Sequence, residues 1–535
     1  MRNGSREFVL ESDARAGTDL LAAVASAHAS GPGAALTWAD SGSARTCRRM
    51  WLDTFDWRLY RAGLTLEQIA RSGLAELVLT GRDGDVLATE RMEDGLKPGW
   101  PGLLRELPAG PLRELLEPVA GVRALAPVAR ATSRVLEQRA LNGDAKTVAK
   151  LCVDRMSVTY PGRAAAPARL TLVPVRGYQT QADKIGRALG ALPGVSDGRM
   201  SALDTALAAA GARAGERPGK ASAVELSPVM PAATAMAAIL TALLDALEAN
   251  VSGTIKDIDT EFLHDLRIAV RWTRSALKLC GRALPDGLAR RFRPEFRWLG
   301  DLTAPTRDLD VYLLGFPDMA AGLVGATESE LAPFHDHLIR SRMAAHAQLS
   351  RGLRSARFSR LTSDWRSELA AVRPARKRPM AAQLAAERIG TAQRQALTAG
   401  RLINAASPAE SLHELRKRCK ELRYLVEMFG SLHDPAQRWQ AVRELKSLQD
   451  CLGEFQDAEV QTAEIRAFAA QMLADRSAPS ETLLAMGEIA AGLARRQRRA
   501  RSEFDGRFAD FASPASQARL TELTRTSGRT RTAGA

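Results

Sequence analysis

The chain has 535 residues, of which 45% are hydrophobic and 25% are charged, and these shares exclude disorder over the whole length. At about 100 to 200 residues per domain, the length favours two domains or more. Lys and Arg exceed Asp and Glu by 75 − 61 = 14. The surface should therefore attract polyanions, a class that includes nucleic acid, anionic lipid and phosphate polymers.

Residues 1–208 are predicted to form a domain of antiparallel strands with a few helices. Short extended patterns, separated by loops that contain Gly and Pro, predict strands at 8–10, 75–79, 86–88, 148–153 and 170–175. Residues 209–227 lose this periodicity and gather Gly, Pro and Lys, which is typical of an interdomain linker.

Helical periodicity continues from residue 228 to 512 and predicts an all-α domain. The pattern breaks at 284–286, 304–305, 407–408 and 433–435, where Pro occurs. The apolar stretch Val229–Leu244 is shorter than the about 20 residues that a bilayer requires, so no membrane partner is expected. Residues 513–535 are rich in Ser, Thr, Arg and Gly, and we expect disorder there beyond a helical turn or two.

The five cysteines are widely spaced and include no CxxC pair. This pattern favours reduced thiols over a disulfide framework or a zinc site. Residues 1–7 contain no apolar signal core. We therefore expect a cytoplasmic protein.

An internal repeat lies inside the helical region. The segment LHDLR at 263–267 recurs as LHELR at 412–416, an offset of 413 − 264 = 149 residues. The correspondence continues without a gap and pairs Arg271 with Lys420, Arg274 with Arg423, Arg297 with Lys446, Asp301 with Asp450, and 308–311 with 457–460. A duplicated helical bundle with a pseudo-two-fold axis explains this series, whose period is too long for a solenoid.

Basic side chains form a stripe along each repeated helix. At about 100° per residue, the first stripe is about 80° wide and lies beside an apolar face. We call it the first ridge, and it comprises His264, Arg267, Arg271, Arg274 and Lys278. The second ridge, at the same angles, comprises His413, Arg416, Lys420 and Arg423.

A solvated helix face is the ordinary explanation of a charge run. Like charges three or four residues apart repel each other, however, and the nearby acids point away from both ridges. An uncompensated ridge that occurs twice indicates a polyanionic ligand, and the prevalence of Arg suits phosphate oxygens. Basic clusters at 290–293 and 495–501 could extend this surface.

The histidines and acids of the repeat do not predict a metal site, and no cofactor is expected. His264 and His413 each lack a second ligand at helical spacing, so a phosphate contact or helix packing is the expected role. Asp308 and Asp310 lie about 200° apart on a helix, which favours charge pairing or capping.

Residues 261–278 and 411–424 resemble the two signature helices of the CHAD domain family. The resemblance covers about 228–512 and implies two pseudo-symmetric four-helix bundles whose basic residues bind inorganic polyphosphate. The residues that it assigns to binding are His264, Arg267, Arg271, Arg274, Lys278, His413, Arg416, Lys417, Lys420 and Arg423. Arg297 and Lys446, which the repeat pairs, complete the predicted site.

Residues 52–66, LDTFDWRLYRAGLTL, resemble the CYTH family of triphosphate tunnel enzymes. The resemblance implies an eight-stranded antiparallel barrel whose inward residues grip a triphosphate and a divalent metal. The catalytic pattern is largely missing, however. The family's Glu-x-Glu-x-Lys strand reads EFVLE at Glu7–Glu11, its Arg-x-Arg reads EQI at Glu67–Ile69, and the strand at 170–175 has no carboxylate. Weak anion binding stays open, through Arg130, Arg134, Lys146 and Lys150.

These observations together predict a non-catalytic, cytoplasmic polyphosphate-binding protein that associates with polyphosphate granules. Two alternatives stay open. The barrel could be a metal-dependent tripolyphosphatase or nucleotide triphosphate hydrolase that uses unconventional ligands. The basic surface could instead bind nucleic acid, although aromatics are only 5% of the chain and no nucleic-acid motif is recognised.

Overall fold

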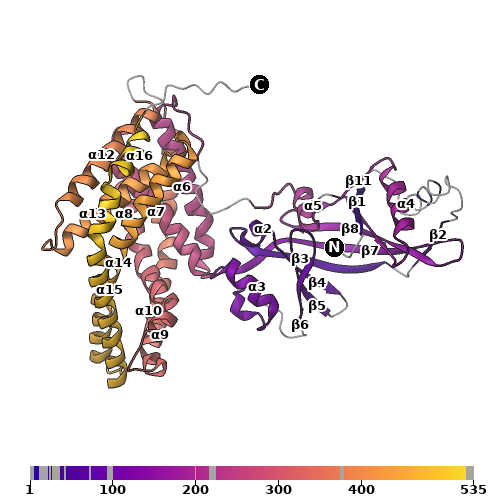
Figure 1. Cartoon of the computed structure of the whole chain (residues 1–535), viewed down its shortest axis with the longest axis horizontal. Helices are drawn as coiled ribbons and strands as arrows, with labels where there is room; N and C mark the ends of the chain where they lie inside the picture. The colour runs from indigo at the N-terminus through magenta and orange to yellow at the C-terminus, as the bar shows by residue number, and fades with distance from the viewer. Residues whose placement is uncertain are drawn as a thin grey trace. The chain divides into compact units, whose positions relative to one another are not determined.

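The computed structural model describes residues 5–10, 22, 24, 26, 36–40, 44–71, 74–92, 100–198, 200–215, 224–373 and 379–525. The chain divides into two compact units, residues 1–218 and 219–535. Figure 1 shows that the first unit is built on strands and the second on helices. The prediction of an antiparallel-sheet domain followed by a helical domain is therefore confirmed.

One antiparallel sheet forms the framework of the first unit. Its strands are β1 (Arg6–Leu10), β2 (Thr37–Asp40), β3 (Arg45–Thr54), β4 (Thr65–Arg71), β5 (Leu74–Thr80), β6 (Val86–Met92), β7 (Leu125–Leu141), β8 (Thr147–Tyr160), β9 (Ala164–Ala165), β10 (Ala168–Pro174) and β11 (Val195–Asp197). The order is β11-β1-β10-β8-β7-β3-β4-β5-β6, with β2 beside β7 and β9 beside β8. The predicted closed barrel is wrong, because closure requires the outermost strands to pair and, among the described residues, β11 and β6 do not.

Helices cover both faces of this sheet. They are α2 (Arg58–Arg61), the short 3-10 helix η1 (Leu104–Glu106), α3 (Pro111–Ala120), α4 (Gln179–Gly190) and α5 (Ala202–Ala209). Ile185 and Leu189 of α4 belong to the buried cluster that contains Phe8 of β1. Leu207 of α5 belongs to a different buried cluster, with Trp51 of β3. In β8, Leu151 and Val153 belong to the first cluster, and Met156 and Val158, which have the opposite parity along the strand, belong to the second, so α4 and α5 lie on opposite faces.

The second unit consists of helices joined by short connections. They are α6 (Ala232–Ile255), α7 (Thr260–Cys280), η2 (Gly281–Ala283), α8 (Leu288–Leu314), α9 (Phe316–Ala321), η3 (Glu328–Leu331), α10 (Ala332–Leu353), α11 (Ala356–Ala370), α12 (Ala381–Arg401), α13 (Ala409–Met428), η4 (Gly430–Leu432), α14 (Pro435–Ala474), α15 (Ser480–Ala512) and α16 (Pro514–Glu522). The predicted helical break at 304–305 is wrong, because Pro305 lies inside α8. Proline removes one helical hydrogen bond there, and the packing of α8 on α7 and α10 holds the helix together.

The helix boundaries follow the internal repeat. The starts of α6 and α12 differ by 381 − 232 = 149 residues, and the starts of η2 and η4 differ by 430 − 281 = 149. Helices α7 and α13 and helices α8 and α14 also correspond at this offset. The division of the unit into two four-helix bundles stays a prediction.

The end of the described chain is ordered further than its composition predicts. Helix α16 begins at Pro514, and its Leu520, together with Leu523 just beyond it, is buried in the core of the unit. The expected helical turn or two after residue 512 is thus a helix of 9 residues, and the packing of Leu520 and Leu523 stabilises it. Residues 526–535 lie outside the described residues.

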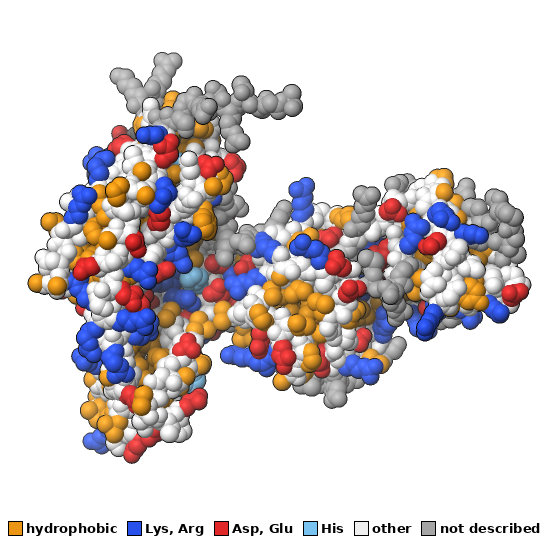
Figure 2. All heavy atoms as spheres, in the orientation of Figure 1, with side chains coloured by type: hydrophobic (Ala, Val, Ile, Leu, Met, Phe, Trp, Pro, Cys, Tyr) orange, Lys and Arg blue, Asp and Glu red, His pale blue; other side chains and the backbone are white. Residues whose placement is uncertain are grey.

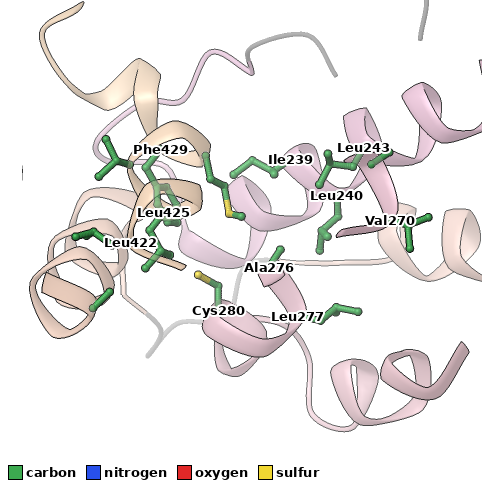
Figure 3. Close-up of a cluster of buried hydrophobic side chains, with 14 of the residues drawn as sticks. Ile239, Leu240, Leu243, Val270, Ala276, Leu277, Cys280, Leu422, Leu425 and Phe429 are labelled. Atoms are coloured by element: carbon green, nitrogen blue, oxygen red, sulfur yellow. The ribbon is translucent and has the colours of Figure 1, made fainter. Parts of the chain in front are cut away.

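Helix α6 forms the centre of the helical core. Its 24 residues are long and apolar enough to cross a membrane by length and composition, so the expectation that this apolar stretch is too short is wrong. However, 61% of its most apolar window is buried inside the unit. Figure 3 shows the reason: Leu240 of α6, Leu277 of α7 and Leu425 of α13 point into one cluster. This cluster also fixes α7 and α13, the two ridge-bearing helices, near each other.

Candidate functional site

Local signals fix the start and the rotation of the ridge-bearing helix α7. The carboxylate of Asp259 caps the helix, because its Oδ1 accepts hydrogen bonds from the backbone N–H groups of Glu261 (2.9 Å) and Phe262 (3.2 Å). Leu266, Val270 and the other apolar side chains of the helix are buried. The first ridge consequently lies along the edge of the core and reaches solvent at Arg271, Arg274 and Lys278.

The two ridges lie next to each other. Lys278 Nζ of α7 lies 2.5 Å from Glu421 Oε1 of α13, and the rings of Trp272 and Tyr424 are 5.6 Å apart between centroids. Burial, followed by the charges of Arg416 and Arg271, lowers the pKa of Lys420 to about 8. The charge on the first ridge therefore acts directly on the second.

A groove of about 680 Å³ opens beside the first ridge, and we call it the first-half groove. Its lining residues are Arg271, Arg274, Ser275, Lys278, Arg293, Pro294 and Arg297. Within the described part of the chain, Arg271, Arg274 and Arg297 form no ion pair and no side-chain hydrogen bond. On the face that Figure 2 presents, Lys and Arg side chains gather on the surface of the helical unit.

A glycine and a backbone carbonyl group position two of the arginines that line the groove. A Cβ atom at Gly300 of α8 would lie 2.5 Å from Arg274 Nη1, so glycine leaves the space that this guanidinium occupies. Arg293 Nη2 donates to the carbonyl oxygen of Leu277 at 2.6 Å, near the C-terminus of α7. This contact anchors one wall of the groove and satisfies a terminal helix carbonyl.

Cations of the second ridge have acidic neighbours. Arg416 donates from Nη1 to Gln456 Oε1 (2.6 Å) and from Nη2 to Asp457 Oδ1 (2.9 Å). His413 Nε2 lies 2.7 Å from Glu459 Oε2, and Arg423 Nε lies 3.5 Å from Glu427 Oε1. Their positive charge is therefore partly neutralised within the protein.

The structure does not gather every predicted site residue. Lys446 lies in a separate pocket of about 350 Å³ and pairs with Asp450 at 3.5 Å, so it does not join its repeat partner Arg297. Lys417 is exposed and lies 3.7 Å from Glu414 on its own helix. His264 is half-buried on α7, near the start of the first ridge.

Arg307 of α8 belongs to the same electrostatic cluster, although the ridge pattern did not indicate it. Burial lowers the pKa of Arg267, and the charges of Arg271, Arg307 and Arg274 lower it further. Arg307 Nη1 is buried and has no hydrogen-bond partner among the described residues. Arg307 begins the sequence Arg-Asp-Leu-Asp at 307–310, in which only the two acids were considered as site residues.

The acids of that sequence pair with arginines, as the charge-pairing interpretation predicts. Asp310 Oδ1 accepts a hydrogen bond from Arg342 Nε at 2.5 Å. Asp308 Oδ1 lies 4.0 Å from Arg267 Nη2, and burial raises the pKa of this carboxyl group. Among the described residues, no group of three or more His, Cys, Asp or Glu side chains could hold a metal ion.

In the first unit, arginine side chains pair with acidic side chains on the strands that the CYTH resemblance assigns to catalysis. Arg49 binds Glu67, with Nη2 donating to Oε2 at 2.9 Å, and its Nη1 donates to Asp154 Oδ2 at 2.9 Å. Arg169 Nη2 donates to Glu7 Oε2 at 2.7 Å. Glu7, an acid of the expected pattern, and Glu67, which stands where the pattern has an arginine, are thus each paired with an arginine. Glu11 lies outside the described residues.

Helix α5 lies on the same face of the sheet as this network. Arg169 Nη1 donates to Thr205 Oγ1 of α5 at 3.0 Å. Leu203 and Leu207 of the helix are buried in the cluster that contains Trp51, over whose ring the Arg49 guanidinium lies. Helix α5 and the ion pairs of Arg49 and Arg169 therefore cover this part of the sheet face.

Comparison with known proteins supports the assignment of the helical unit. Residues 238–466 match the family model of the CHAD domain, so the chain carries a CHAD domain. No curated protein matches the chain.

Three solved structures are similar to parts of the chain. The CHAD domain from the plant Ricinus communis is 22% identical, with a TM-score of 0.46, and the match covers 54% of this chain and 96% of that one. PptA from Streptomyces chartreusis is 18% identical, with a TM-score of 0.42 and coverage of 52% and 99%. A candidate adenylate cyclase of Bacillus halodurans is 13% identical, with a TM-score of 0.23 and coverage of 35% and 89%.

Proposed function

We propose that this chain, whose residues 238–466 form a CHAD domain, binds inorganic polyphosphate through the two adjacent ridges and does not hydrolyse it. One observation carries the proposal: Arg271, Arg274 and Arg297 line a single groove without any acidic partner among the described residues. Lys420 of the second ridge is close enough to Arg271 for the charge of Arg271 to lower the pKa of Lys420. Uncompensated guanidinium groups in one groove favour an anionic ligand that supplies the missing charge.

Polyphosphate fits this site better than an isolated phosphate does. The ridges extend along two neighbouring helices, so a polymer can meet several cations at once, and each contact releases condensed counterions as it does on nucleic acid. Isothermal titration of the full chain with long-chain polyphosphate tests the proposal. We expect saturable binding that weakens as salt is added, and an absence of binding at low salt would refute it.

The first unit supports binding without catalysis. We propose that it is a degenerate relative of the CYTH fold, in which Arg169 neutralises Glu7 of the expected metal-binding strand, and Arg49 pairs with Glu67, which stands where the family has an arginine. Magnesium requires free carboxylates together with substrate phosphates. The full chain should therefore release no phosphate from tripolyphosphate with magnesium or manganese. Metal-dependent release that Glu7→Gln abolishes would favour the hydrolase alternative.

Nucleic acid is the competing polyanion, because the ridge charges alone do not distinguish phosphate polymers. Exposed aromatic platforms for bases are scarce near the groove, since both Trp272 and Tyr424 are at least partly buried. We therefore propose that polyphosphate displaces RNA or DNA at matched phosphate and salt concentrations, and that the protein associates with polyphosphate granules in the cytoplasm.

A further inference from the structure

We propose that the two halves of the duplicated site are unequal, and that the first-half groove is the primary anchor for a short stretch of phosphate chain. This inference rests on the proposed function and identifies where within the site the ligand is held. It assigns the second ridge, apart from Lys420, a secondary role.

The two halves differ at positions that the repeat makes equivalent. Arg274 has no acidic partner among the described residues, whereas its equivalent Arg423 lies 3.5 Å from Glu427. Glu427 itself stands where the first half has Lys278, since 278 + 149 = 427. An acid thus replaces a base at the end of the second ridge.

Two further equivalent pairs differ in the same direction. Arg267 lies 4.0 Å from Asp308, but Arg416 donates to Asp457 at 2.9 Å. Asp310 is engaged by Arg342, whereas its equivalent Glu459 lies 2.7 Å from His413. Ion pairs on a surface contribute little to stability, yet the carboxylate beside each cation still repels an approaching phosphate.

The charges that line the two pockets show the same contrast. The first-half groove is lined by five cations and no acid, namely Arg271, Arg274, Lys278, Arg293 and Arg297. Even if Lys278 is discounted because it pairs with Glu421, four cations remain. The pocket that holds Lys446 is lined by three cations and three acids, which are Arg443, Lys446 and Arg507 with Asp450, Glu454 and Glu503. Its formal charge is 3 − 3 = 0.

The repeat supplies matched variants for the test. We would titrate the full chain with tripolyphosphate and compare Arg274→Gln with Arg423→Gln, and Arg297→Gln with Lys446→Gln. Removal of one charge-assisted hydrogen bond should weaken binding about tenfold or more for each first-half variant, and less than about threefold for its second-half equivalent. Thermal unfolding of each variant reports any damage to the fold. If Arg423→Gln destabilises α13, the comparison of Arg297→Gln with Lys446→Gln still tests the inference, because Lys446 is exposed.

Each outcome is decisive. Equal decreases in affinity from both members of each pair, or larger decreases in the second half, would overturn the inference while leaving polyphosphate binding intact. If the unmodified chain bound neither tripolyphosphate nor long-chain polyphosphate, the proposed function would fail, and the inference would fail with it.

Discussion

Arg342 of α10 joins two acids from separate parts of the helical unit. Its Nε donates to Asp310 Oδ1 of α8 at 2.5 Å, and its Nη1 and Nη2 donate to Asp257, which follows α6, at 2.6 Å each. Asp310 is only 1% exposed, so this guanidinium neutralises a buried charge.

Removal of Arg342 should therefore destabilise the helical unit. Arg342→Met leaves the Asp310 carboxylate buried without its cation, which should lower the free energy of unfolding by about 3 kcal/mol. Chemical denaturation monitored by circular dichroism measures the change. Arg340→Met, on the exposed side of the same helix, should change stability by less than about 0.5 kcal/mol. Similar decreases in both variants would contradict this account.

Gly300→Ala should weaken ligand binding without unfolding the protein. The new Cβ would lie 2.5 Å from Arg274 Nη1, and the flexible guanidinium would have to leave its place in the groove. Alanine is the better helix former by up to about 1 kcal/mol, which offsets the crowding. We expect a several-fold decrease in tripolyphosphate affinity by calorimetry.

The matched control for Gly300→Ala is Gly506→Ala in α15, where a Cβ meets no atom within 4 Å. That variant should keep full affinity and gain helix stability. If both substitutions left the affinity unchanged, Arg274 would not need its present position to bind the ligand.

Affinity should depend on pH through Lys420. Burial and neighbouring arginines lower the pKa of this lysine from its ordinary value to about 8, so it is charged below pH 8 and loses its proton as the pH rises through that value. Attraction for a polyanion should consequently decrease between about pH 7 and 9. A bound polyanion favours the charged form, so binding near pH 8.5 should take up protons.

Calorimetry in two buffers with different ionisation enthalpies measures this proton uptake. Lys420→Arg keeps its charge throughout the range and should take up fewer protons, which separates the lysine from protonation of the ligand itself. Identical uptake by Lys420→Arg and the unmodified chain would exclude Lys420 as the titrating group.

Reversal of charge at the junction of the ridges should change the salt dependence of binding. Arg271→Glu with Lys420→Glu replaces two attractive interactions by repulsion, so affinity for long-chain polyphosphate should fall at least about a hundredfold. By analogy with nucleic acid, the slope of log affinity against log salt should decrease by about 0.7 to 0.9 for each phosphate that the protein no longer neutralises. Fluorescence titration over a range of salt concentrations tests both expectations.

The control for that experiment must avoid Arg291, because it pairs with Asp364 at 3.1 Å and with Glu368 at 2.5 Å on α11. Reversal of its charge would repel both acids. Arg340→Glu with Arg354→Glu changes the net charge equally at exposed positions that do not line the groove. Equal decreases in affinity from both double variants would mean that diffuse surface charge carries the binding.

Periodicity predicted the helical unit well because it depends on spacing along one chain segment. The 149-residue offset located α7 and α13 and identified the ridges that the structure brings together. The offset could not give the ion pairs of the second ridge. The partners of Arg416 and His413 lie on α14, some 40 residues further along the chain, and only packing fixes that distance.

Other features depend on contacts that local sequence does not encode. Closure of the first-unit sheet depends on whether its outermost strands meet, which no strand pattern specifies. The helical continuation through Pro305 and the order of α16 both come from tertiary packing that outweighs a local helix breaker or a polar composition. Arg307 was missed because its helix carries no repeated basic stripe.

The open order of the first-unit sheet has a consequence for its local stability. A closed barrel would protect every strand on both sides, but here β7 and β8 are bonded to neighbours on both edges, whereas β6 bonds only to β5 among the described residues. Amide protons should therefore exchange with solvent deuterium slowest in β7 and β8 and fastest in β6. The sheet would unravel from its margins inward, and exchange rates measured strand by strand would trace that sequence.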